Sequence, residues 1–138
     1  MRIMAIDYGD AHTGIAISDP TGLLAGFTTV INAYRPDRVT GQIALLAKEH
    51  RVERLVLGHP INMDGTRGPR SEKAQAMRQL LEETTGLTVV LWDERRTTID
   101  AHQILMSSGK NAKKRKKVVD AVAASLILEG YLTFKKSH

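Results

Sequence analysis

A short apolar hairpin at the amino terminus constrains the fold of this chain more than any other feature. Residues Arg2 to Asp7 alternate and are mostly apolar, which predicts a β-strand. A second strand is predicted from Thr13 to Ser18, after a turn at Gly9. The first strand ends in the carboxylate of Asp7, where a buried strand meets solvent. Such a carboxylate needs a cation, a metal or several hydrogen-bond donors, unless it only caps the turn that follows it.

The segments after this hairpin alternate between strand and helix patterns. Phe27 to Asn32 is rich in β-branched residues and predicts a third strand, so three strands joined by short turns form an antiparallel meander. The pattern continues with a helix from Pro36, a strand over Glu53–Leu57, a helix over Ser71–Thr85 that ends at Gly86, and a strand over Leu87–Trp92. Strands separated by helices form parallel crossovers. We therefore predict an α/β fold with helices flanking a five-stranded mixed sheet, whose first three strands are antiparallel and whose strands 1, 4 and 5 are parallel.

Apolar residues at helical spacing indicate which sides of the two middle helices are buried. The predicted inner stripes are Val39, Ile43, Leu46, Ala47 and His50 in the first helix and Ala74, Met77, Leu80 and Leu81 in the second. The single tryptophan, Trp92, is predicted to lie in the core rather than to stack on a base.

The segment 58–70, GHPINMDGTRGPR, has no apolar periodicity and predicts a long loop. Loops of this length in a compact domain are usually functional or disordered. No Lys-Ser/Thr pair follows its glycines at the spacing of a Walker loop, so a nucleotide-binding loop of that kind is excluded.

The last third of the chain joins a charged segment to a long apolar helix. Two acids, two bases and two hydroxyls follow one another over Asp93–Thr98, and Thr98 is a plausible N-cap for a helix that runs to Ser108. The final helix is predicted from Val118 to Phe134 and is apolar nearly all round. Asp120 falls in its first turn, where the helix dipole alone would stabilise an anion. The alanines beside it, however, would let the helix approach the sheet closely.

Most of the net charge of +5 comes from one short segment. Residues 110–117, KNAKKRKK, hold six of the 20 basic residues and no acid, leaving 14 basic and 15 acidic residues elsewhere. We interpret the segment as a basic loop that binds a polyanion. The alternative is a solvated linker between helices.

Composition excludes several other classes of protein. The length of 138 residues predicts one domain, 1–138. The hydrophobic content of 42% includes no run long enough to cross a bilayer, and no signal peptide is recognisable, so we expect a cytoplasmic protein without a membrane partner. The absence of cysteine excludes disulfides and thiolate metal sites. The five histidines show no zinc-ligand spacing.

The predicted topology brings acidic residues together. Strands 1, 4 and 5 run parallel, so their carboxyl ends share one edge, where open α/β sheets bind ligands. Asp7 and the pair Asp93-Glu94 lie at this edge, and Asp120 joins them if the amino end of the last helix lands beside strand 1. Clustered carboxylates repel one another, and divalent cations relieve that repulsion. Two such ions can activate a water and stabilise the leaving oxygen in phosphodiester cleavage.

Four sequence blocks together carry a resemblance to a known family. They are Asp7-x-Gly9-x-x-x-x-Gly14-Ile15-Ala16, Gly58-His59-Pro60-Ile61-Asn62-Met63-Asp64-Gly65-Thr66, Asp93-Glu94-Arg95-Arg96-Thr97-Thr98 and Asp120-Ala121-Val122-Ala123-Ala124-Ser125-Leu126-Ile127-Leu128. Over essentially the whole chain, the sequence resembles the YqgF family, described as Holliday junction resolvases and as pre-16S ribosomal RNA nucleases, with an RNase H-like three-layer fold. The resemblance implies that Asp7, Glu94 and Asp120 are the catalytic, metal-binding acids. It also implies that the cofactor is Mg²⁺ or Mn²⁺, bound as two ions.

Candidate substrate-binding residues surround these acids. They are Gly9, Asn62, Arg95, Thr97, Thr98, Lys113, Lys114, Arg115, Lys116 and Lys117. The chain departs from the family after Gly9, where Ala11-His12-Thr13 replaces a basic pair or a single Arg. His12 supplies that charge only when it is protonated. Periodicity alone leaves open whether Asp93 or Glu94 is the ligand, because adjacent strand residues face opposite ways; Glu94 follows from the resemblance.

The sequence therefore supports a metal-dependent endonuclease that acts on structured nucleic acid. The first hypothesis is an enzyme that processes pre-16S ribosomal RNA, as a monomer or weak homodimer, with structured RNA preferred over DNA junctions. The second is a Holliday junction resolvase, which would need a two-fold dimer. The third is a nucleic-acid-binding factor that does not cleave. The glycine hairpin also resembles the phosphate loop of actin-like ATPases, but those enzymes enclose a nucleotide between two such domains.

Overall fold

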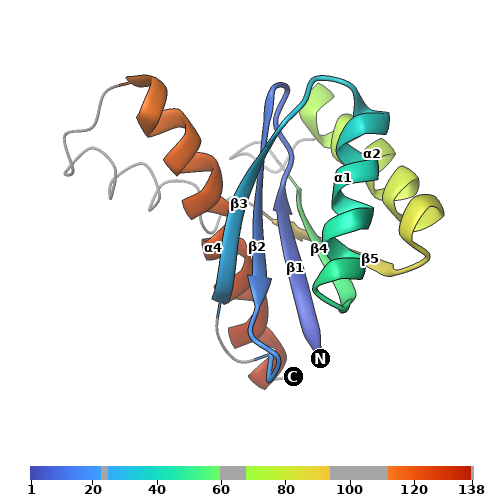
Figure 1. The fold of residues 1–138 in the computed structure, drawn as a ribbon, viewed down its shortest axis with the longest axis vertical. Helices are drawn as coiled ribbons and strands as arrows, with labels where there is room; N and C mark the ends of the chain where they lie inside the picture. The colour runs from blue at the N-terminus through green and yellow to red at the C-terminus, as the bar shows by residue number, and fades with distance from the viewer. Residues whose placement is uncertain (23–24, 60–67, 94–111, 138) are drawn as a thin grey trace.

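The computed structural model describes residues 1–22, 25–59, 68–93 and 112–137 (Figure 1). Within the last range, side chains are described for residues 121–135. These segments form a central β-sheet with helices on both faces.

The sheet has five strands in the order β3-β2-β1-β4-β5. Their bounds are β1 Arg2–Asp7, β2 His12–Ser18, β3 Ala25–Asn32, β4 Val52–His59 and β5 Thr88–Asp93. The pairs β1·β2 and β2·β3 are antiparallel, and the pairs β1·β4 and β4·β5 are parallel. The predicted mixed sheet, with its antiparallel first half and parallel strands 1, 4 and 5, is confirmed.

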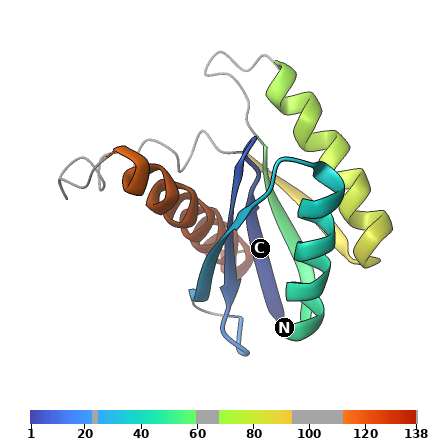
Figure 2. The same cartoon turned by 45° about the horizontal axis from the view of Figure 1, so that its top comes forward.

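Three described helices cover the two faces of this sheet. Helices α1 Pro36–Glu49 and α2 Pro69–Thr85 lie side by side on one face, and α4 Ala112–Ser137 crosses the other face (Figures 1 and 2). Proline occupies the first turn of both α1 and α2, where its missing N–H costs no helical hydrogen bond. Gly86 ends α2 in the left-handed conformation, with φ of 71°, as its C′ position predicts.

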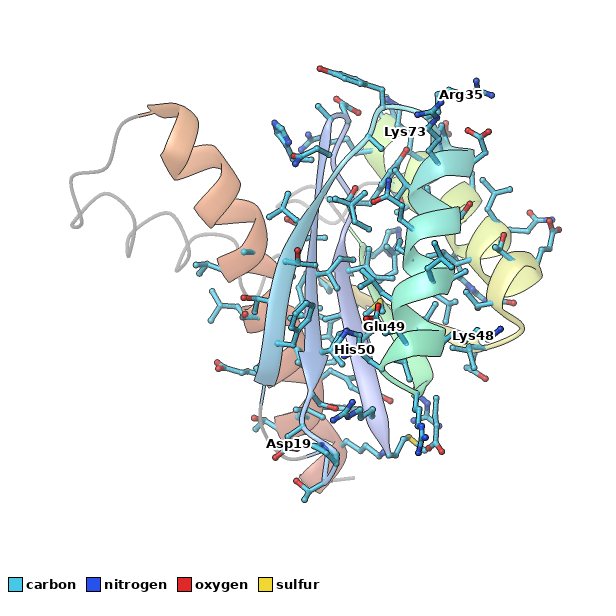
Figure 3. All side chains as sticks on the ribbon, viewed as in Figure 1. Asp19, Arg35, Lys48, Glu49, His50 and Lys73 are labelled. Carbon is cyan, nitrogen blue, oxygen red and sulfur yellow. The ribbon has the colours of Figure 1, made fainter. Side chains whose placement is uncertain are left out.

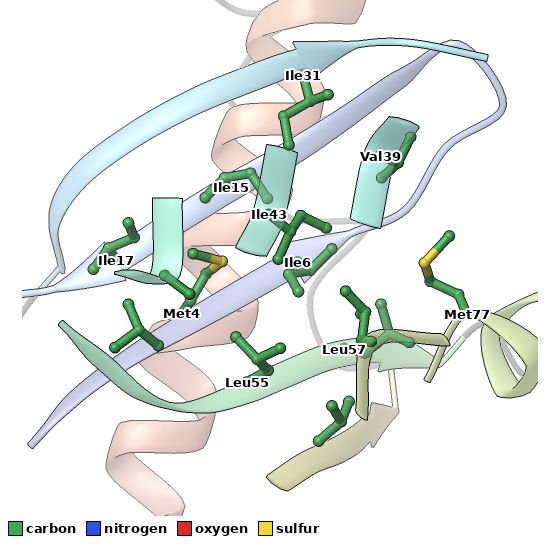
Figure 4. Packing of buried hydrophobic residues seen from close by; sticks show 14 of the residues in the cluster. Met4, Ile6, Ile15, Ile17, Ile31, Val39, Ile43, Leu55, Leu57 and Met77 are labelled. Atoms are coloured by element: carbon green, nitrogen blue, oxygen red, sulfur yellow. The ribbon is translucent and has the colours of Figure 1, made fainter. Parts of the chain in front are cut away.

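Alternation along the strands divides the core into two layers. Met4 and Ile6 of β1 join a cluster on the α1/α2 face, which also contains Ile43 and Met77 (Figure 4). Ile3 and Ala5 of the same strand face α4 instead. Because β1 is apolar on both faces, as a central strand must be, its position in the middle of the sheet follows from its sequence.

The α4 layer combines alanines with larger aliphatic and aromatic residues. Ala124, Ile127 and Leu128 pack on β1 and β2, and Trp92 of β5 makes an edge-to-face contact with Tyr131 at a ring separation of 6.0 Å. Trp92 is 8% exposed, so its predicted place in the core is confirmed. The small side chains let the helix lie close to the sheet, as the alanine-rich sequence indicated.

Two details of the predicted elements are wrong. Leu80 was assigned to the inner stripe of α2 but is 38% exposed, whereas Ala74, Met77 and Leu81 are buried. The strand predicted to end at Leu57 continues through Gly58 to His59, and α2 begins at Pro69, so the segment between them is shorter than the predicted loop. Residues 60–67 of that loop lie outside the described residues, as does the helix predicted over Thr98–Ser108.

The basic segment, predicted to be a loop, is mostly helical. Helix α4 begins at Ala112, so Lys113–Lys117 form its first turns instead of a loop. Lys, Arg and Ala are all strong helix formers, and this local preference explains the longer helix. Asp120 consequently lies in the third turn and not in the first, so the helix dipole does not account for its presence.

Candidate functional site

The carboxyl ends of the parallel strands lie at one edge of the sheet. Asp7 ends β1, His59 ends β4 and Asp93 ends β5. Asp7 is half-buried and pairs with Gly14 across the β1–β2 hairpin. This is the edge at which parallel sheets place their ligands, so the structure puts Asp7 where the sequence predicted it.

Strand alternation separates the two described carboxylates at this edge. Asp7 has the same parity as Ile3 and Ala5, which face α4. Asp93 has the same parity as Val89 and Leu91, which pack on the α1/α2 side. The two side chains therefore start from opposite faces of the sheet, and Asp93 does not share the face of Asp7.

His59 and Ser71 form a buried polar link that sequence reasoning did not find. The Nε2 atom of His59 lies 2.6 Å from the Oγ of Ser71, the two side chains are 6% and 0% exposed, and the hydrogen bond ties the end of β4 to the first turn of α2. In the parallel register His59 stands opposite Asp93. Only the tertiary contact identifies the pair, because a lone His and a lone Ser twelve residues apart carry no local signal.

Gly9 is required by the geometry of the β1–β2 turn. A Cβ atom added at this position would clash with the backbone carbonyl oxygen of His12. A clash with backbone cannot be relieved by rotating a side chain, so the glycine has a structural role whatever it contacts in a substrate.

His12 follows this turn and is held by Asn32. Its Nδ1 atom lies 2.6 Å from Oδ1 of Asn32 on the neighbouring strand β3. An amide oxygen only accepts hydrogen bonds, so this contact places a proton on Nδ1 and leaves Nε2 for other interactions. His12 shares its parity with Gly14 and Ala16, and Ala16 packs in the α4-side cluster, so His12 lies on the same face as Asp7.

Helix α4 runs with its amino end toward the same end of the molecule as this edge and with its carboxyl end against the sheet (Figure 1). Its carboxyl end reaches the start of β1, since the Nζ of Lys135 lies 3.6 Å from the Sδ of Met1. The helix therefore runs opposite to β1, and its amino end lies toward the end of the molecule at which Asp7 is found (Figure 1). Asp120 precedes the buried residues Ala123 and Ala124 by three and four positions in the sequence of α4.

The other predicted site residues fall outside this description. Asn62, Glu94, Arg95, Thr97 and Thr98 lie outside the described residues, and the side chains of Asp120 and of Lys113, Lys114, Arg115, Lys116 and Lys117 are likewise not described. Within the part of the chain that the structure describes, no group of three His, Asp or Glu side chains could hold a metal ion. No helix in that part is long and apolar enough to cross a membrane.

The arrangement of sheet and helices defines a fold class that is shared with known resolvases. The RuvC protein of Thermus thermophilus in complex with a Holliday junction substrate superposes with a TM-score of 0.64 at 15% identity, covering 99% of this chain and 96% of that chain. The Fowlpox virus resolvase gives a TM-score of 0.54 at 10% identity, covering 99% of this chain and 98% of that chain. The protein therefore has the RNase H-like fold of RuvC.

Sequence comparison identifies the family. Residues 1–134 match the family described as "RuvX: Holliday junction resolvase". A relative from Halothermothrix orenii is 42% identical over 98% of this chain and 96% of its own length, and one from Bacillus subtilis is 43% identical over 96% of this chain and 97% of its own length. Both relatives are named "Putative pre-16S rRNA nuclease". The chain belongs to the RuvX (YqgF) family.

Proposed function

We propose that the protein is a divalent-metal-dependent endonuclease that processes precursor 16S ribosomal RNA in the cytoplasm. The observation that carries this proposal is the place of Asp7, half-buried at the carboxyl end of the central strand β1, on the sheet face that α4 covers. Membership of the RuvX family and the names of the relatives support the nuclease class and the ribosomal RNA substrate.

Oxygen ligands at this edge suit Mg²⁺ or Mn²⁺. Asp7 offers a carboxylate, and the chain has no cysteine to favour a softer metal. Asp7, Glu94 and Asp120 would hold two ions, which when bound supply an activated water and stabilise the leaving oxygen. Asp7 itself contributes a carboxylate at the end of the central strand, on the sheet face that α4 covers.

Strand alternation supports Glu94 over Asp93 as the second acid. Val90 and Trp92 of β5 pack against the α4-side cluster, and Asp93 has the opposite parity. A chain that stays extended for one more residue brings position 94 to the face of Asp7. The family resemblance also implies that Glu94 is a metal-binding acid.

The first turns of α4 are proposed to bind the phosphate backbone. In the sequence of α4, Lys113, Lys116 and Lys117 recur at helical spacing. Lys116 and Lys117 precede Asp120 by four and three residues. Basic side chains at that place would hold a polyanion beside the acids. Gly9, Asn62, Arg95, Thr97 and Thr98 remain the proposed contacts to the strand that is cut.

Holliday junction resolution is the second candidate function. It is favoured by the description of the family and by the shared fold with a RuvC that was solved with a junction substrate. Symmetric cutting of a junction requires a two-fold dimer, whereas a ribosomal RNA nuclease can act as a monomer or weak dimer. Sedimentation at the concentrations used for cleavage shows whether the protein is a stable dimer, as junction resolution requires, or a monomer.

Cleavage of a substrate panel by matched variants tests the proposal. The parent protein, Asp7→Asn and Asp19→Asn are incubated with Mn²⁺ and precursor ribosomal RNA, single-stranded RNA or junction DNA. Asp19 is a suitable control because it lies far from the carboxyl end of β1. It is at the opposite end of the molecule from the start of α1 (Figure 3). We expect the parent and Asp19→Asn to cut precursor RNA and Asp7→Asn to be inactive with an unchanged melting temperature.

Equal rates for Asp7→Asn and the parent would contradict the assignment of Asp7. Cleavage of junction DNA alone would transfer the proposal to the resolvase function. Tight RNA binding that survives chelation, with no product at any Mn²⁺ concentration, would instead identify a binding factor that does not cleave.

A further inference from the structure

A surface cavity lies on the opposite side of the sheet edge from the face of Asp7. It has a volume of about 350 Å³, within the range of small-ligand pockets. Its walls come from the turn after β1, the segment that leads into α1, and α2, and include Tyr8, Asp10, Tyr34, Lys73, Met77 and Leu80.

The cavity is adjacent to the proposed catalytic edge. Tyr8 follows Asp7 directly in the chain but has the opposite parity, and it packs against the core cluster on the α1/α2 side. Lys73 lies at the same end of the molecule as the start of α1, far from Lys48 at the other end of that helix (Figure 3). A strand of nucleic acid that crosses the edge at Asp7 therefore passes the mouth of the cavity.

The cavity is lined by one buried apolar residue and by two that are exposed. Met77 is buried, but Leu80 is 38% exposed and Tyr34 is 80% exposed. The exposed ring of Tyr34 supplies a flat aromatic surface beside aliphatic side chains. Nucleobases bind to such surfaces by stacking, with little dependence on their identity.

The rim of the cavity carries both signs of charge. The Nζ of Lys73 lies 3.5 Å from Oδ1 of Asp10, and the two side chains are 62% and 76% exposed. An ion pair this long and this exposed holds its partners weakly, so a ligand can replace either interaction. Lys73 can bind a phosphate, and the Asp10 carboxylate can accept hydrogen bonds from the N–H groups of a base.

Tyr8 adds a phenol hydroxyl to the lining of the cavity. Such a hydroxyl can donate a hydrogen bond to a ring nitrogen or a carbonyl oxygen of a base.

We propose that this cavity binds one unstacked nucleobase of the substrate strand, stacked on Tyr34, with the adjoining phosphate on Lys73. The inference deepens the proposed nuclease function and rests on it for the identity of the strand. The combination of a flat aromatic wall, a cation and a carboxylate fits a nucleotide better than an apolar peptide side chain, which offers neither a phosphate to Lys73 nor N–H groups to Asp10.

Single abasic substitutions test the base site without requiring catalysis. Oligoribonucleotides that carry one abasic position, moved along the strand, are titrated with the protein in EDTA, where no metal-dependent cleavage occurs. We expect one position at which loss of the base weakens binding to the parent by roughly 5- to 100-fold, the range typical of a single stacked base. Tyr34→Ala should bind the intact strand as weakly and should no longer distinguish the abasic position. Leu45→Ala, an exposed apolar residue of α1, is the matched control and should behave like the parent.

A second readout concerns the phosphate. Lys73→Gln should reduce the dependence of log affinity on log salt by about one phosphate contact. Lys48→Gln, at the other end of α1, should leave the slope unchanged, whereas equal slopes for all three proteins would remove Lys73 from the site.

The outcomes separate this inference from the nuclease function. If the parent cleaves RNA but Tyr34→Ala and the parent show the same abasic profile, the base site is wrong while the nuclease assignment stands. If the abasic profile depends on Tyr34 but no nucleic acid is cut, the base site stands and the nuclease assignment fails. If binding depends neither on the base at any position nor on Tyr34 and Lys73, the inference is overturned.

Discussion

At the scale of single residues, the two carboxylates that end strands β1 and β5 belong to different faces of the sheet. Asp7 and Asp93 both end parallel strands, yet their parities place them with different layers of the core. Alternation was visible in the sequence, but the face that each parity meets was not, because it depends on which helices cover which side. The structure shows that Asp93 belongs to the α1/α2 face, whereas periodicity alone left open whether Asp93 or Glu94 shares the face of Asp7.

The two adjacent acids are expected to respond very differently to neutralisation. Glu94→Gln should lower the cleavage rate by roughly 100-fold or more, since removing one electrostatic stabiliser of a transition state typically costs 10²–10³. Asp93→Asn should retain most activity, because its side chain belongs to the other face. Single-turnover rates with Mn²⁺ measure both, and a larger loss for Asp93→Asn would reverse the assignment.

The buried pair of His59 and Ser71 is expected to contribute to stability. Ser71→Ala removes one partner of a buried hydrogen bond and should lower the free energy of unfolding by about 1–3 kcal/mol. Thr84→Ala, on the exposed side of the same helix, should change it by less than about 0.5 kcal/mol. Urea denaturation compares the two variants, and equal effects would show that the pair contributes little.

At the scale of elements, the strands were easier to predict from sequence than the last helix. The alternation and β-branching of the strands are local signals, and the prolines and Gly86 mark helix ends through backbone geometry that the sequence states directly. The predicted start of α4 was wrong because a dense basic segment resembles a solvated loop, although its residues also favour a helix. The predicted burial of Leu80 was wrong because the helical period identifies a stripe of residues but cannot show that a surface cavity exposes one of them.

The helical basic segment is expected to dominate the salt dependence of binding. Replacing Lys113, Lys116 and Lys117 together by Gln should reduce the slope of log affinity against log salt by about 2–3, since each phosphate contact contributes about 0.7–0.9. Glutamine is itself a good helix former, so α4 should remain intact by circular dichroism. A triple variant with the slope of the parent would show that this side of α4 does not meet the nucleic acid.

At the scale of the whole molecule, the topology brings the ends of distant segments to one edge of the sheet. Strands β1, β4 and β5 end at this edge, and α4 runs in the opposite direction to β1. The topology was predictable from the order of strands and helices, because parallel crossovers align carboxyl ends. The contacts that bind α2 to the sheet edge, and the cavity beside Tyr8, were not, because both arise only when segments far apart in sequence are packed together.

Crystals of the protein grown with Mn²⁺ give the most direct measurement of the central claim. Anomalous scattering locates manganese without reference to any catalytic assay. The account predicts manganese bound by the carboxylate of Asp7, with Glu94 and Asp120 as its other protein ligands, and predicts that Asp7→Asn crystals lose it. Manganese bound elsewhere, or the three carboxyl groups found too far apart to share ions, would contradict the account.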